Sequence, residues 1–80
     1  MGTSMKELYE IKITFDRQYF KQLKKLNKMT NQDLSDETGI PVTTIGNYSR
    51  GRRIPNVCAL YKIAMVLDVP MEDLMVEVNE

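Results

Sequence analysis

The sequence contains no histidine and a single cysteine among its 80 residues. Without histidine, the chain lacks both the usual proton carrier at neutral pH and the commonest metal ligand of proteins. The one cysteine, Cys58, cannot form a disulfide within the chain. It lies in an apolar helical pattern without a basic neighbour, which is typical of an unreactive thiol in a protein core. We therefore expect no enzyme, no cofactor and no metal site.

Long apolar runs and glycine-rich loops are absent as well. No apolar stretch approaches the roughly 20 residues of a membrane-spanning helix, and the N-terminus lacks the apolar centre of a signal peptide. The four glycines, at positions 2, 39, 46 and 51, are too scattered for a phosphate-binding loop. Together with the single cysteine, these absences favour a cytoplasmic protein without membrane contact. The length allows one domain with a modest core.

The net charge of zero conceals an uneven distribution of charge. Residues 17–28 contain five basic side chains and no acidic one, and Arg50, Arg52 and Arg53 add three further cations. The last thirteen residues contain five acidic side chains and no basic one. Because the field near a surface depends on local charge, a zero sum does not exclude a polyanionic partner.

The periodicity of apolar residues predicts a short strand followed by helices. Residues 8–15 alternate with period two, which is typical of a half-buried strand. Capping residues then place helices at about 17–27, 31–38 and 42–49, and a fourth from residue 57. Residues 70–75 predict a fifth helical turn, and "MVEV" a second strand. The two strands could pair with each other or across a dimer. The residues expected at helix starts and at the end of the second helix are Asp16, Thr30, Asn56 and Gly39.

The stretch from Leu34 to Ile45 has the small and apolar residues of a tight helix-turn-helix. Two helices joined by a short turn cross closely, which requires a small residue such as Ser35 on the first helix. Gly39, four residues later, allows the positive φ of the turn. Leu34, Ile40 and Ile45 are spaced to support the second helix from behind. An ordinary helical corner would also satisfy this pattern.

Residues 20–74 resemble the lambda-repressor and Cro-like helix-turn-helix family, also called the xenobiotic-response-element family. The resemblance rests on "TNQDLS", "GIPVTTI", "RGRRIPN" and the final "LxxIAxxLDVPMEDL" pattern. It implies an all-α, compact four-to-five-helix DNA-binding domain, here with short terminal β-strands. The expected division is an N-terminal segment over 1–15, a helix-turn-helix domain over 16–76 and a tail over 77–80. Residues 1–4 look like a cloning remnant.

The resemblance also implies functional residues. The base-reading positions of the family fall on Val42, Thr43, Thr44 and Asn47, in a helix expected to enter the major groove. Phosphate contacts are expected from Lys24, Asn31, Arg50, Arg52 and Arg53. Ser49 replaces the usual glutamate, so we expect no ion pair between that position and the first helix. Gly46 lies inside the reading helix at a cost of about 1 kcal/mol relative to alanine.

Two functions therefore compete on the sequence alone. The first is a sequence-specific transcriptional regulator, expected to be a repressor, that binds double-stranded DNA as a homodimer through its fifth helical turn and its terminal segments. Leu74, Val76 and Val78 lack an obvious cover within the chain, which favours such a dimer. The second is an antitoxin or another protein-interaction module, which would bind a partner protein through the acidic C-terminus and the N-terminal strand.

Overall fold

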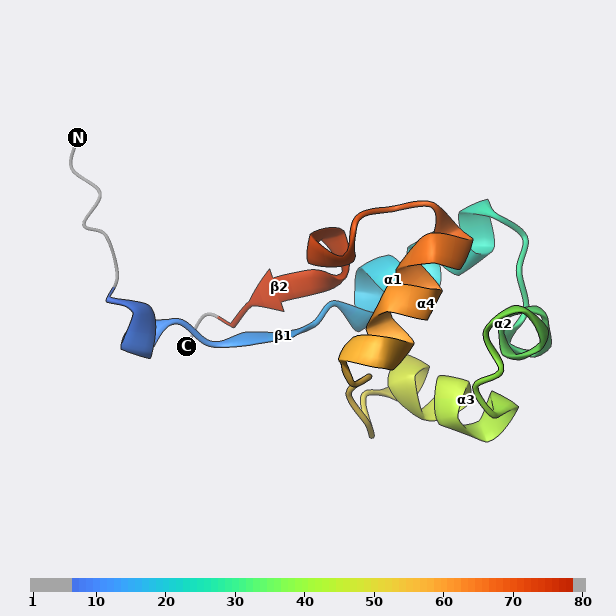
Figure 1. Cartoon of the computed structure of the whole chain (residues 1–80), viewed down its shortest axis with the longest axis horizontal. Helices are drawn as coiled ribbons and strands as arrows, with labels where there is room; N and C mark the ends of the chain where they lie inside the picture. Colours follow the sequence, from blue (N-terminus) through green and yellow to red (C-terminus); the bar gives the residue numbers. More distant parts are fainter. Residues whose placement is uncertain (1–6, 79–80) are drawn as a thin grey trace.

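The computed structural model of the protein describes residues 7–78. Within these residues, four α-helices form the body of the molecule and a two-stranded ribbon extends from it (Figure 1). The expected remnant at residues 1–4 lies outside the described part of the chain. The elements, in chain order, are η1 (Leu8–Glu10), β1 (Ile13–Phe15), α1 (Arg17–Leu26), α2 (Asn31–Thr38), α3 (Val42–Arg50), α4 (Val57–Leu67), η2 (Met71–Leu74) and β2 (Met75–Glu77).

Side-chain caps begin three of the four helices. The carboxylate of Asp16 accepts a hydrogen bond from Tyr19 N at 3.0 Å, and Asn56 Oδ1 accepts one from Ala59 N at 2.8 Å. Thr30 and the residue three positions later exchange hydrogen bonds as a capping box. Each cap satisfies backbone N–H groups that have no partner inside the helix. The predicted starts of α1, α2 and α4 are confirmed.

Glycines with positive φ end α2 and α3. Gly39 has φ 77°, and its N–H donates to Ser35 O at 2.8 Å, so the predicted end of α2 is confirmed. Gly51 has φ 76° and follows Arg50, one residue beyond the predicted end of α3. An L-residue with a Cβ adopts this left-handed conformation only with strain.

The hydrophobic core receives side chains from all four helices, from β1 and from η2. Phe15 links the ribbon to the helices, because its ring centroid lies 5.2 Å from that of Phe20 and 6.2 Å from that of Tyr48. These tilted and edge-on geometries are the favourable ones for aromatic rings. The buried apolar residues are Phe15, Phe20, Leu23, Leu34, Ile40, Ile45, Tyr48, Ala59, Leu60, Ile63, Ala64, Leu67 and Leu74.

The two strands pair with each other inside one chain. β1 and β2 are antiparallel, with Thr14 opposite Val76. The N–H of Val78 donates to Lys12 O, and that of Asp16 donates to Leu74 O, each at 2.8 Å. The ribbon projects from the helical body and gives the protein extents of 46 × 22 × 19 Å (Figure 1). Of the two pairings left open by the sequence, the structure has the one within the chain.

The predicted strand over 8–15 is correct only for Ile13–Phe15. Residues 8–10 instead form the 3-10 helix η1, in which Glu7 N donates to Glu10 Oε1 at 3.1 Å and Glu10 N to Glu7 O at 2.9 Å. The backbone pairing of the ribbon ends near Val78 in the described chain, so residues 8–10 have no strand partner there. Local capping therefore determines their conformation.

Five predictions of burial or exposure are wrong. The helical spacing of apolar residues predicted inward positions for Leu26 in α1 and for Val57 and Tyr61 in α4, but all three are exposed, Leu26 to 78%. The buried face of α4 is formed instead by Ala59, Leu60, Ile63, Ala64 and Leu67. Cys58 lies on the exposed side of the same helix. Leu74 is fully buried by its own chain, so it does not need the partner that the sequence suggested.

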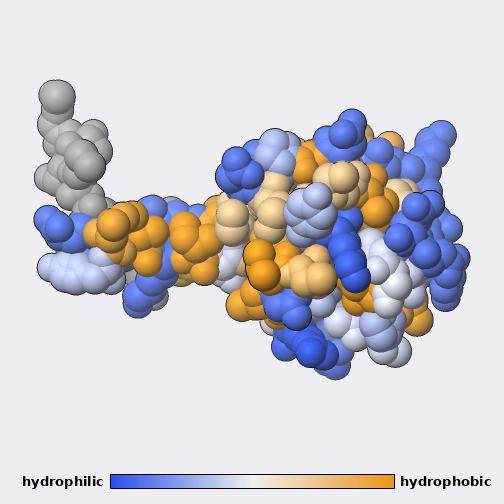
Figure 2. Space-filling model, in the orientation of Figure 1, coloured by the Kyte–Doolittle hydropathy of each residue, from blue (hydrophilic) through white to orange (hydrophobic). Residues whose placement is uncertain are grey.

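Apolar side chains also lie on the surface of the ribbon. Figure 2 shows hydrophobic residues along the projecting arm as well as on the body. Leu8, Ile13 and Val76 are exposed there. Within residues 7–78, no helix is long and apolar enough to cross a bilayer.

Candidate nucleic-acid interface

α3 presents one polar face to solvent and buries the other. Ile45 and Tyr48 point into the core, where Ile45 is fully buried. Residues 43, 47 and 50 follow the spacing i, i+4 and i+7, which places Thr43, Asn47 and Arg50 along one face of the helix. This face is opposite the buried one. α3 thus has the shape of a helix that can insert into a groove.

The four predicted base-reading residues differ in exposure. Val42 and Thr43, in the first turn of α3, are exposed, whereas Thr44 and Asn47 are half-buried. Thr44 lines an open depression of about 410 Å³ together with Arg53 and Asn56. The structure therefore places all four on the N-terminal two-thirds of α3 and brings one of them close to a predicted phosphate contact.

Asn47 and Arg50 are joined on the exposed face. Arg50 Nη2 donates a hydrogen bond to Asn47 Oδ1 at 2.9 Å. The guanidinium also lies over Gly46, where an added Cβ would be 3.2 Å from Arg50 Nη1. The sequence placed Asn47 among base contacts and Arg50 among phosphate contacts, so it did not indicate that the two side chains touch.

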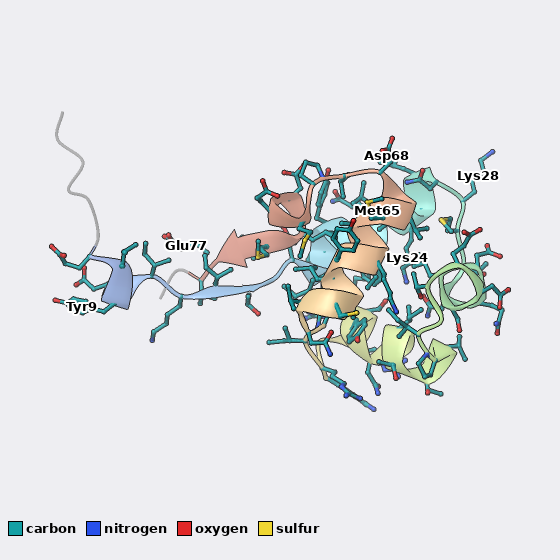
Figure 3. All side chains as sticks on the ribbon, viewed as in Figure 1. Tyr9, Lys24, Lys28, Met65, Asp68 and Glu77 are labelled. Atoms are coloured by element: carbon teal, nitrogen blue, oxygen red, sulfur yellow. The ribbon has the colours of Figure 1, made fainter. Side chains whose placement is uncertain are left out.

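Lys24 connects three helices at one point. Its Nζ donates to Asn31 Oδ1 at 2.5 Å and to Ser49 Oγ at 2.9 Å, and it lies 4.8 Å from the centroid of the Phe20 ring. Figure 3 labels Lys24, whose side chain points from α1 towards α2 and α3. Ser49 stands where the resembled family commonly has a glutamate. Its hydroxyl accepts a hydrogen bond from Lys24 in place of the ion pair that a glutamate would make.

The surroundings of Lys24 disfavour its charge. Both acceptors of its ammonium are neutral, and the side chain is half-buried. Burial lowers the pKa of Lys24 below its ordinary value of 10.5, and the positive charge of Lys21 lowers it further. The contact with Lys24 engages Asn31 Oδ1 at the N-terminus of α2, where the helix has free backbone N–H groups.

Arg17 belongs to the site although the sequence did not identify it as a site residue. Its Nη1 donates to Ser49 O at 3.3 Å, near the C-terminal end of α3. Its side chain also covers Gly51, where an added Cβ would lie 2.9 Å from Arg17 Nε. A cation at this end of a helix is favourable because the last carbonyl groups carry partial negative charge. No local pattern reveals the contact, since 32 residues separate the two partners.

The loop after α3 carries two further exposed cations. Arg52 and Arg53 are exposed, and the backbone N–H of Arg52 donates to Asn47 O at 2.9 Å. This bond folds the loop back against the end of α3. The fold therefore gathers Arg17, Arg50 and Arg52 around the end of the helix, close to Arg53. Positive charge at the end of a helix face of groove size suits a polyanionic duplex.

The sequence of the chain matches one family model. Residues 20–74 match the model described as Helix-turn-helix, which is more than half of the chain. A comparison with curated proteins gave no match.

Solved structures with the same fold include the following two proteins. One is the restriction-modification controller protein C.AhdI from Aeromonas hydrophila, with a TM-score of 0.69 and 22% identity, over 72% of this chain and 88% of that one. The other is a transcriptional regulator from Listeria innocua, with a TM-score of 0.71 and 19% identity, over 84% of this chain. The match spans 63% of the length of the Listeria protein.

Proposed function

Because the chain belongs to the Cro/C1-type helix-turn-helix family, we propose that it is a DNA-binding transcriptional regulator that acts as a repressor in the cytoplasm. One observation supports this proposal most directly. The exposed face of α3 carries the neutral hydrogen-bonding groups of Thr43 and Asn47 together with Arg50, and the cations of Arg17, Arg52 and Arg53 lie near its C-terminal end. A groove-reading element flanked by phosphate-binding charge has this arrangement.

The proposal assigns base contacts to the start and middle of α3. Thr43 and Thr44 offer hydroxyl groups, Val42 offers an apolar contact for a thymine methyl, and the amide of Asn47 can pair with adenine. These side chains are available because Ile45 and Tyr48 hold the helix to the core from the opposite side. α3 would therefore lie with this face in the major groove.

Phosphate contacts are assigned to the two sides of that helix. Arg52 and Arg53 follow α3, while Asn31 begins α2, where the free N–H groups of the helix favour an anion. With its Oδ1 bound to Lys24, the amide NH2 of Asn31 is the group left to donate to a phosphate oxygen. Lys24 adds positive charge directly behind this contact.

A homodimer is part of the proposal. α3 has nine residues, so one copy can contact few base pairs, and two copies related by a two-fold axis would read a longer palindromic site. The surface that fits this role is the α4 face, formed by Val57, Tyr61 and Met65, which are 74%, 55% and 64% exposed. These three residues share one side of α4, at spacings of four, and Figure 3 labels Met65 there. A second copy of the chain would cover the α4 face.

Selection of bound sequences from a random duplex pool tests the function. The full chain should enrich one motif with two-fold symmetry, and its affinity should fall steeply as salt increases. Replacing both Arg52 and Arg53 by alanine should weaken binding to every duplex and reduce the salt slope by about one per lost contact. Lys25→Ala, which removes an exposed cation of α1 outside this site, is the matched control. A chain that enriches no motif would contradict the proposal.

A protein-interaction role is the second candidate, and the ribbon favours it. Leu8, Tyr9 and Ile13 are exposed on an arm that projects from the body (Figure 1). An antitoxin of this fold would use such an arm to bind its partner protein. Stoichiometric co-purification of one protein from the native host, with no enriched DNA motif, would support this function over regulation.

A further inference from the structure

We propose that Arg50 is a base-reading residue that recognises guanine from the exposed face of α3, rather than a phosphate contact. This inference rests on the proposed DNA-binding function and adds a determinant of specificity to it. It follows from where the side chain lies, what it touches and why Gly46 has no side chain.

The position of Arg50 on the helix places it among the reading residues. Thr43, Asn47 and Arg50 are separated by four and three residues, so they form one row along α3. The core-facing residues Ile45 and Tyr48 lie on the other side. Arg50 is still helical, whereas Arg52 and Arg53 follow the helix in the loop. Arg50 therefore extends the polar row by one turn towards the C-terminus.

The side chain is folded along this row. Arg50 Nη2 donates to Asn47 Oδ1 at 2.9 Å, so the guanidinium points back along α3 and not away from its end. The five N–H donors of an arginine are fixed in one plane. With one donor bound to Asn47, the group still has enough donors for two acceptors on a base edge. The hydrogen bond also fixes the orientation of the Asn47 amide.

Gly46 provides the space that this conformation needs. An alanine Cβ at position 46 would lie 3.2 Å from Arg50 Nη1, 3.4 Å from Nη2 and 3.6 Å from Cζ. The contact with Nη1 is tighter than most Cβ contacts, so the guanidinium would have to shift by a few tenths of an ångström. Glycine is otherwise unfavourable inside a helix. Its presence four residues before Arg50 is explained if the flat side chain has to lie against the helix.

The paired N–H donors of the Arg50 guanidinium favour guanine over the other bases. In the major groove, guanine presents N7 and O6 as two adjacent acceptors, and arginine donates to both at once. Adenine replaces one of these acceptors with an amino donor, which would oppose the guanidinium. A phosphate contact would instead require only positive charge, and lysine could supply it. This difference between arginine and lysine separates the two roles.

The decisive variants are Arg50→Lys and Gly46→Ala. The full-length wild type and both variants are used in duplex selection, with Lys25→Ala as the control and thermal unfolding by circular dichroism as the check of folding. We expect Arg50→Lys to lose about five- to 150-fold of the preference for guanine at one position of each half-site, the range for one bidentate contact. We expect Gly46→Ala to lose preference at the same position, because its Cβ displaces the guanidinium. Lys25→Ala should keep the wild-type profile.

The outcomes separate this inference from the function on which it rests. A wild-type motif that Arg50→Lys retains unchanged would overturn the assignment of Arg50 and leave the DNA-binding function intact. A third variant, Arg50→Ala, tests the phosphate role: an equal loss of affinity for all sequences, with a flatter salt dependence, would identify a phosphate contact and also overturn the assignment. A wild type that enriches no motif would overturn the proposed function itself. If Gly46→Ala fails to fold, Arg50→Lys alone tests the assignment, because the Arg50 side chain is exposed and its replacement should leave the fold intact.

Discussion

The ammonium of Lys24 on α1 lies 2.9 Å from the hydroxyl oxygen of Ser49 on α3. The same nitrogen binds Asn31 Oδ1 at the first residue of α2. One lysine therefore fixes the start of α2 and the end of α3 relative to α1, and both of its acceptors are uncharged. The contact thus ties both helices of the helix-turn-helix to α1.

Replacing Lys24 should destabilise the fold. Lys24→Ala removes two hydrogen bonds from a charged donor and the contact with the Phe20 ring. We expect the free energy of unfolding to fall by about 1–3 kcal/mol, as for other hydrogen bonds to charged groups. Urea denaturation measures this loss. Lys25→Ala, on the exposed side of the same helix, should change stability by less than about 0.5 kcal/mol. Equal effects of the two changes would contradict a role for the Lys24 contacts.

The stability of the protein should also depend on the protonation of Lys24. Burial and the charge of Lys21 lower its pKa in the folded state below 10.5, so the unfolded chain binds this proton more tightly. Stability must then rise with pH between the lowered folded pKa and 10.5. We expect the wild type to gain stability over Lys24→Met across this interval. A 13C-detected titration of the Lys24 Cε group should give a midpoint below 10.5, and a midpoint at or above 10.5 would contradict the prediction.

The C-terminal 3-10 helix should be essential to the core. Leu74 is fully buried, so Leu74→Ala should cost about 2–5 kcal/mol, the range for a leucine removed from a packed interior. Leu26→Ala is the matched control, because Leu26 is 78% exposed and its loss leaves no cavity. Chemical denaturation of both variants compares the costs. A Leu74→Ala variant as stable as Leu26→Ala would show that η2 does not contribute to the core in solution.

The two glycines that end helices should tolerate alanine unequally. Both have φ near 77°, so each replacement costs about 1 kcal/mol of backbone strain. At Gly39 an added Cβ meets no atom within 4 Å, whereas at Gly51 it would lie 2.9 Å from Arg17 Nε. Gly51→Ala should therefore cost about 0.5–1 kcal/mol more, because Arg17 must leave its hydrogen bond to Ser49 O. Thermal unfolding of the two variants gives the difference, and a larger loss at Gly39 would refute this explanation.

The proposed dimer should depend on the α4 face. Met65→Glu places a charge at one end of the apolar α4 face that a second copy would cover, and the Met65 side chain is exposed in the single chain. We expect sedimentation velocity to show a dimer for the wild type and a monomer for Met65→Glu, with unchanged helical content. Gln22→Glu introduces the same charge on the exposed side of α1 and should leave the dimer intact. A dimer that survives Met65→Glu would exclude this surface as the interface.

The sequence predicted those parts of the fold that local chemistry determines. Asp16, Thr30 and Asn56 begin helices because each side chain binds a backbone N–H three residues later, and Gly39 ends α2 because it can adopt positive φ. These contacts join residues only three or four positions apart, so the amino-acid sequence itself indicates them. The bounds of the helices, and the helix-turn-helix among them, were predicted from these local signals.

The contacts that organise the candidate site could not be predicted in this way. Lys24 with Ser49, and Arg17 with the same residue, join positions 25 and 32 residues apart. The contact of Arg50 with Asn47 is local, yet three-residue spacing alone does not show whether a flexible cation folds back or extends into solvent. The exposure of Val57 and Tyr61 likewise depends on which side of α4 the other helices cover.

The pairing of β1 with β2 has a consequence for the biogenesis of the protein. These strands lie near opposite ends of the chain, whereas the contacts between α2 and α3 join neighbouring elements. Closing so long a loop is entropically costly and slow compared with local helix contacts. During synthesis, β1 can pair only after β2 has left the ribosome, and Leu74, which directly precedes β2, enters the core no earlier than it emerges itself. The nascent chain therefore holds Phe15 without its strand partner Met75 until β2 has emerged, so the ribbon completes the fold after the contacts between neighbouring helices can form.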